Sequence, residues 1–118
     1  MLLMEYPRCS TSNKAKKWLD DHDVKYEARH MVDNNPTYEE LKKWYKDSGL
    51  PLKNFFNTSG MLYRELSLKE KLPAMSEDEQ LKLLTTNGML VKRPIVVGAD
   101  FVLVGFKEKQ WQEVLLGK

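Results

Sequence analysis

The order of the apolar patterns along the chain limits its fold more than any other feature. Strand patterns lie near the two ends, whereas residues 33–92 carry helical spacings. Near the N-terminus, apolar Leu2–Tyr6 and alternating Val24–His30 flank a helical run over about Asn13–His22. A helix between two strands lets them run parallel, so this end predicts a βαβ unit.

The C-terminal end predicts two short strands and a helix. Ile95–Val97 and Phe101–Val104 are rich in β-branched and aromatic residues, and Gly98–Asp100 between them is typical of a hairpin turn. A helix is expected from Lys107 to about Leu116. Combining the two ends predicts an α/β fold with a mixed four-stranded sheet, βαβ then ββα.

The middle of the chain, about residues 33–92, predicts a helical insert. Capping residues, apolar spacings and helix stops mark its helices. The expected helices follow Thr37 to Ser48, cover Pro51–Phe56, add a turn or two within Met61–Leu68, and follow Ser76 to about Asn87. We expect residues 1–118 to form a single domain, because a chain of 118 residues with 42% hydrophobic content suffices for one core.

Charge and hydropathy exclude several classes of function. The net charge is +2, and Lys and Arg are interspersed with Asp and Glu, so direct nucleic-acid binding is not expected. No apolar run approaches the ~18 residues that a membrane span requires. Trp18, Trp44 and Trp111 fit core positions and mark no exposed interface. We expect a cytoplasmic monomer that does not bind membranes.

Cys9 is the only cysteine and lies where the first strand gives way to a helix. A thiol at a helix N-terminus meets free backbone N–H groups and the positive end of the helix dipole, which favour the nucleophilic thiolate. Arg8 and Lys14 add positive charge nearby, whereas Glu5 would raise the pKa of the thiol if it came close. The alternative is that Cys9 is a small buried hydrophobe.

Three hydroxyl residues follow the cysteine. Ser12 lies within one helical turn of Cys9, so its hydroxyl can donate a hydrogen bond to the thiolate. Ser10 and Thr11 can cap the helix, which is the ordinary role of such residues. A single cysteine cannot form an internal disulfide, so any redox cycle needs an external thiol, such as glutathione or a partner protein.

Neither histidine suggests a metal site. His22 and His30 have no metal-ligand spacing and no second cysteine to join them, so we assign them no role. We expect neither a metal nor a bound cofactor.

The element order, together with Cys9–Ser12 and Lys92–Val97, resembles the glutaredoxin-linked arsenate reductases and their Spx-like relatives. The resemblance covers nearly the whole chain and implies a thioredoxin-like fold. It also implies that Pro94 is cis and lies beside Cys9, and that Arg93 supports the thiolate and binds an oxyanion. In the reaction implied by the family, Cys9 attacks arsenic, and glutathione and glutaredoxin then release arsenite.

The sequence departs from the family pattern at three positions. Asn57 and Phe106 occupy the places of two further arginines, and Glu5 replaces a histidine before the cysteine. Lys107 and Arg64 are candidates to supply the missing positive charge. We predict that Cys9, Ser12 and Arg93 carry the chemistry. The predicted substrate-binding residues are Ser10, Thr11, Asn57 and Pro94.

Three functions remain open at this point. The first is reduction of an oxyanion such as arsenate, and the second is thiol-disulfide exchange on glutathionylated proteins, with Asn54–Gly60 contacting peptide. The third, from the Spx-like branch, is a regulatory module that binds RNA polymerase without catalysis. Such regulators commonly carry Cys-x-x-Cys, which Ser12 interrupts here, and they extend beyond the last helix. We therefore favour a reductase.

Overall fold

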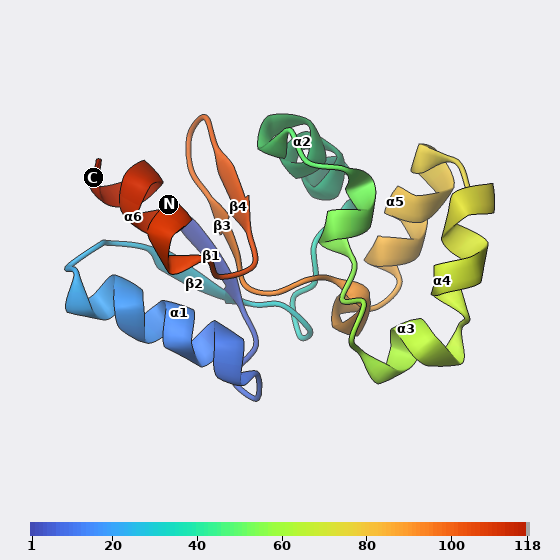
Figure 1. Cartoon of the computed structure of the whole chain (residues 1–118), viewed down its shortest axis with the longest axis horizontal. Coiled ribbons are helices and arrows are strands. Elements are labelled where there is room, and N and C mark those ends of the chain that lie inside the picture. The colour runs from blue at the N-terminus through green and yellow to red at the C-terminus, as the bar shows by residue number, and fades with distance from the viewer. Residues whose placement is uncertain (118) are drawn as a thin grey trace.

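The computed structural model describes residues 1–117 and contains a four-stranded mixed sheet beside a group of helices (Figure 1). The strand order is β2-β1-β3-β4. β1 (Leu2–Glu5) runs parallel to β2 (Glu27–His30) and antiparallel to β3 (Ile95–Val97). β3 pairs antiparallel with β4 (Val102–Val104). The predicted α/β class and mixed sheet are confirmed.

One face of the sheet is covered by α1 (Ser10–Asp21) and α6 (Glu108–Leu116), as Figure 1 shows. Alternate strand residues point toward these two helices because side chains along a strand face opposite sides in turn. The resulting cluster contains the three sheet residues Leu3, Val96 and Leu103 with Ala15, Trp18, Leu19 and Trp111 of the helices.

The other face packs against the helical insert. Its helices are α2 (Tyr38–Ser48), α3 (Met61–Glu65), α4 (Leu68–Lys71) and α5 (Glu77–Thr85), with 3-10 helices at Leu52–Phe55, Leu72–Ala74 and Gly88–Leu90. The sheet contributes Met4, Ile95, Val102 and Val104 to the cluster on this side, which also contains Trp44, Phe55 and Phe56. As predicted, Trp18, Trp44 and Trp111 are buried.

The two longest insert helices begin at capping boxes. Thr37 and Glu40 exchange side-chain and backbone hydrogen bonds at the start of α2, and Ser76 and Glu79 do so at α5. Gly49 ends α2 in the left-handed conformation, with φ 68°. The expected boundaries of both helices are therefore confirmed to within a few residues.

The end of β2 is tied to the insert by close contacts. The Arg29 guanidinium forms two hydrogen bonds with the Glu40 carboxylate, at 2.6 and 2.9 Å. Gly88 lies so close to the backbone that a Cβ there would be 2.2 Å from the Met31 carbonyl oxygen. These contacts fix the insert relative to the sheet. Within the described residues, no helix combines the length and apolar character needed to cross a membrane.

Candidate thiol site

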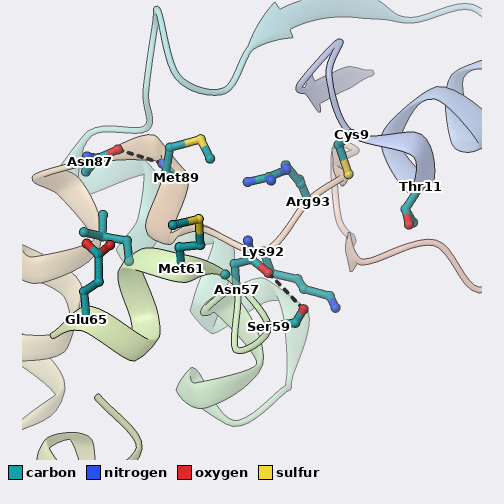
Figure 2. Close-up of a pocket in the computed structure, with 12 residues that line it drawn as sticks. Cys9, Thr11, Asn57, Ser59, Met61, Glu65, Asn87, Met89, Lys92 and Arg93 are labelled. Atoms are coloured by element: carbon teal, nitrogen blue, oxygen red, sulfur yellow. Dashed lines mark hydrogen bonds between the residues drawn. The ribbon is translucent and has the colours of Figure 1, made fainter. Parts of the chain in front are cut away.

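Cys9 lines a cleft of about 590 Å³ between the sheet and the insert. Four lining residues come from the N-terminus of α1 and the segment that leads into β3, namely Cys9, Thr11, Lys92 and Arg93. The insert supplies Asn57, Ser59, Gly60, Met61, Leu62, Glu65, Asn87 and Met89. Figure 2 shows Cys9 and Thr11 at one end and Glu65 and Asn87 at the other.

The backbone around Cys9 presents its sulfur to the start of α1. Cys9 is the N-cap residue, with an extended backbone (φ −99°), and its N–H donates to the Tyr6 carbonyl at 2.9 Å. The helix begins at Ser10, earlier than predicted, and no side-chain oxygen caps it. The prediction that Ser10 and Thr11 cap the helix is wrong, because Cys9 is the residue whose backbone turns into the helix.

Several groups shift the pKa of the thiol. Partial burial raises the pKa of Cys9, but hydrogen bonds from the Ser12 backbone N–H, the Arg93 guanidinium and the Thr11 backbone N–H outweigh it. The positive charge of Arg93 adds to their effect. The pKa of Cys9 therefore lies below its ordinary value, which favours a thiolate over a buried, inert thiol.

Arg93 lies beside the cysteine in an orientation set by an aromatic ring. Its guanidinium carbon is 4.7 Å from the centre of the Tyr6 ring, a cation–π arrangement. Its Nη1 atom is buried and has no hydrogen-bond partner among residues 1–117. The Arg93–Pro94 peptide bond is cis, as expected. Pro94 is buried and does not line the cleft.

Ser12 acts on the sulfur through its backbone N–H, and its hydroxyl has a structural partner. The side chain is fully buried, and its oxygen accepts a hydrogen bond from the Tyr6 N–H at 3.0 Å. This bond fixes the turn between β1 and α1. Donation from the Ser12 hydroxyl to the thiolate stays a prediction.

Glu5 does not oppose the thiolate in the way that the sequence suggested. Its buried carboxylate pairs with Lys16 at 3.2 Å, and it is absent from the groups that shift the pKa of Cys9. The negative charge that replaces the family histidine is thus largely neutralised within the sheet-to-helix packing.

The remaining predicted site residues divide into two groups. Thr11 and Asn57 line the cleft, and the Ser59 hydroxyl donates to the Asn57 Oδ1 at 3.4 Å. Ser10 is exposed outside it. Phe106 packs on the Trp111 ring, with ring centres 4.8 Å apart, and does not line the cleft.

Lys92 supplies the second positive charge of the cleft. Arg64 and Lys107, the candidates named from the sequence, do not line it. The sequence did hold one signal for Lys92, which is its position directly before Arg93. Two neighbouring residues that lead into a strand can both reach the same cleft. Glu65, Asn87 and Met89 were missed because only the folding of the insert brings their segments together.

The histidines take part in packing and turn formation. The His22 ring stacks on Trp18, with centres 4.2 Å apart, and the His30 Nδ1 accepts hydrogen bonds from the Val32 and Asp33 N–H groups. Within residues 1–117, no group of three His, Cys, Asp or Glu side chains could bind a metal ion.

Comparison with known proteins decides the family. The model of the ArsC family matches residues 4–114. The chain belongs to the ArsC family. An ArsC family related protein from Bacteroides fragilis is 58% identical and superimposes with a TM-score of 0.93, over 96% of this chain and 95% of that one. This similarity confirms the thioredoxin-like fold.

Two curated relatives in Bacillus subtilis carry different descriptions. The uncharacterized protein YusI is 57% identical over 108 residues, which is 92% of each chain. The regulatory protein MgsR is 30% identical over 101 residues, which is 86% of this chain and 79% of MgsR. One relative of this chain is thus described as a regulatory protein.

Proposed function

We propose that this ArsC-family protein is a thiol-dependent reductase in which the Cys9 thiolate attacks an oxyanion or a disulfide. The observation that carries the proposal is the Arg93 guanidinium beside Cys9 in an open cleft. One guanidinium can stabilise the thiolate and, through its other N–H groups, bind an oxyanion. A thiolate at a helix N-terminus is also reactive at neutral pH.

With arsenate as substrate, Cys9 would form a bond to arsenic while an oxygen leaves as water. An external thiolate, from glutathione or glutaredoxin, would then attack the Cys9 sulfur and form a disulfide with it. The electron pair of the broken sulfur–arsenic bond would stay on arsenic. A further thiol resolves that disulfide and returns the Cys9 thiolate. Overall, arsenate and two thiols give arsenite, one disulfide and water. Thr11 and Asn57 would contact the substrate through a hydroxyl and an amide.

A disulfide substrate needs fewer positively charged side chains around it than an oxyanion such as arsenate does. The cleft offers Arg93 and Lys92, whereas the family pattern described above implies three arginines. A mixed disulfide with glutathione requires attack by the Cys9 thiolate on sulfur and departure of one thiolate. A cleft of about 590 Å³ also has the size of sites for organic ligands. Glutathionylated peptides are therefore the second substrate class to test.

A regulatory role is the alternative, and the relationship to MgsR favours it. In this role the protein would bind RNA polymerase without catalysis. Ser12 takes the place of a second cysteine, so a switch based on an internal disulfide is not available to this chain. The reductase proposal and this alternative differ in whether Cys9 must be reactive.

The pKa of Cys9 tests the proposal. It is measured from thiolate absorbance and from the pH dependence of alkylation, with Cys9→Ser as the blank. We expect a value below that of an ordinary free cysteine, about 8.5. In Arg93→Ala the pKa rises, and alkylation at pH 7 slows by about fivefold because less thiolate is present.

Arg8→Ala is the matched control, since Arg8 is an exposed arginine next to Cys9. It should leave alkylation nearly unchanged. An ordinary pKa that does not respond to Arg93→Ala would contradict the reductase proposal and favour the regulatory one. A low pKa justifies turnover assays with arsenate and with glutathionylated peptide.

A further inference from the structure

A second cleft of about 400 Å³ adjoins the thiol site and carries three lysines. We call it the lysine cleft, and its lining residues are Lys53, Asn54, Phe56, Thr58, Lys92, Val104 and Lys107. Lys92 lines both clefts. No acidic residue of the described chain lines the lysine cleft. Its charge at neutral pH is therefore strongly positive, in a protein whose net charge is only +2.

The three ammonium groups have no counter-ion in the part of the chain that the structure describes. None of Lys53, Lys92 and Lys107 forms an ion pair within residues 1–117. The acid next in sequence, Glu108, lines a different cleft beside Lys14. Like charges gathered without an anion repel one another, and a bound anion would relieve that repulsion.

The backbone adds to the attraction for anions. Lys107 is the N-cap residue of the nine-residue helix α6 and makes no side-chain cap hydrogen bond, so the positive end of this helix lies at the cleft. Gly105, with φ 76°, lets the Lys92 stem pass close by, because a Cβ there would lie 3.3 Å from Lys92 Cε. Asn54 and Thr58 offer an amide and a hydroxyl as further donors.

We propose that the lysine cleft binds the carboxylates of a small anionic thiol or disulfide whose sulfur reacts with Cys9. The inference rests on the proposed function and names the class of co-substrate. A chain with one cysteine needs an external thiol, and Lys92 joins the place where its carboxylates bind to the cleft that contains Cys9. Two adjoining clefts suit an extended organic molecule better than an inorganic oxyanion.

The test follows one thiol-disulfide exchange at Cys9 and needs no knowledge of the physiological substrate. The Cys9 thiolate attacks one sulfur of a disulfide, a new Cys9 mixed disulfide forms, and the other sulfur leaves as a thiolate. Oxidised glutathione is the anionic probe, and dithiodipyridine is the neutral one. Mass spectrometry of the modified protein gives both rates at the same pH.

The double variant Lys53→Gln and Lys107→Gln removes two charges of the lysine cleft without touching the thiol cleft. We expect its reaction with oxidised glutathione to slow by about tenfold, because the carboxylates lose their partners. Its reaction with dithiodipyridine should change by less than about twofold, since a neutral probe gains little from the lysines. The selectivity between the two probes is the quantity that the proposal predicts.

Lys46→Gln with Lys109→Gln is the matched control, since it removes the same charge from exposed positions outside the lysine cleft. If the reaction with oxidised glutathione slowed as much in this control as in the Lys53 and Lys107 variant, the inference would be overturned, because the effect would then reflect net charge. Unchanged selectivity in the Lys53 and Lys107 variant would also overturn it. Failure of the wild-type protein to react with dithiodipyridine would instead overturn the proposed function.

Discussion

The two walls of the thiol cleft differ in chemistry. One wall, which we call the sheet wall, consists of Cys9, Thr11, Lys92 and Arg93 and carries the thiol and both positive charges. The insert wall consists of residues 57, 59–62, 65, 87 and 89, and it carries amides, apolar side chains and one carboxylate. Every group that lowers the pKa of Cys9 belongs to the first turn of α1 or to Arg93. Reactivity is thus set on one wall, while the insert wall shapes what can approach.

The walls also differ in how firmly their side chains are packed. Arg93 is positioned by the Tyr6 ring, and Ser12 is buried behind the cysteine. On the insert wall, by contrast, Met61 is 73% exposed. A flexible methionine can adapt to ligands of different shape. We infer that changes on the insert wall alter ligand preference without altering the thiol.

The largest expected effect comes from disrupting the contact between the insert and the sheet. In Gly88→Ala the new Cβ would lie 2.2 Å from the Met31 carbonyl oxygen, so backbone must move. We expect a loss of about 3 kcal/mol in the free energy of unfolding, as for severe overpacking. Urea denaturation followed by circular dichroism measures it. Because the insert would shift relative to the sheet, glutathione selectivity should fall as well.

Gly49→Ala is the control for that variant. Gly49 has φ 68° and no neighbouring heavy atom within 4 Å of a built Cβ, so only the left-handed backbone opposes the substitution. Its expected cost is about 1 kcal/mol. If Gly88→Ala cost no more than Gly49→Ala, the close contact with Met31 would not join the two regions.

The second prediction concerns the pH dependence of stability on the sheet wall. Because the native pKa of Cys9 is lowered, the unfolded chain binds more protons than the native protein between the native and unfolded pKa values. The thiolate therefore stabilises the fold at alkaline pH, and this contribution is lost as pH falls through the native pKa. Relative to Cys9→Ser, the wild type should gain stability with rising pH, by under about 1 kcal/mol because the thiolate is partly exposed.

Parallel urea titrations of the two proteins at several pH values measure that difference. A difference that stayed constant with pH would mean that the sheet wall does not favour the thiolate. Arg93→Ala should shrink the gain, whereas Arg8→Ala should leave it intact.

The smallest predicted effect is on the insert wall. Met61→Ala should change the rate of reaction with oxidised glutathione by about twofold, because one exposed side chain contributes little binding energy. The pKa of Cys9 should stay as in the wild type, since Met61 is not among the groups that shift it. Alkylation profiles and disulfide exchange rates of the same preparation separate these effects. A shift of the alkylation profile would show that the walls are not independent.

Local signals in the sequence predicted most of the fold. The capping boxes at α2 and α5 and the turn between β3 and β4 depend on residues a few positions apart. Strand β2 begins only at Glu27, later than predicted. Val24 is still tied to the end of α1, because its N–H bonds to the Leu19 carbonyl at 3.0 Å. Tyr26 packs beside the α1–α6 cluster, which is a tertiary contact.

Local motifs also predicted part of the site, whereas residues from separate segments were missed. Cys9 and Arg93 were predicted because each belongs to a short motif, and the structure brings them together. The Ser12 hydroxyl and the caps at Ser10 and Thr11 were assigned by spacing alone, which cannot tell which atom of a residue faces the sulfur. The lysine cleft escaped notice because Lys53, Lys92 and Lys107 come from three separate segments.

The position of Arg93 over Tyr6 has a practical consequence for anyone who assays this protein. The ring lies against the guanidinium, and Arg93 lines the open cleft beside the thiolate. Small tetrahedral anions have the geometry to bind such a guanidinium. Phosphate and sulfate buffers should therefore act as competitive inhibitors of oxyanion substrates. Activity measured in them would understate the reactivity of the site, and buffers without oxyanions are the appropriate choice.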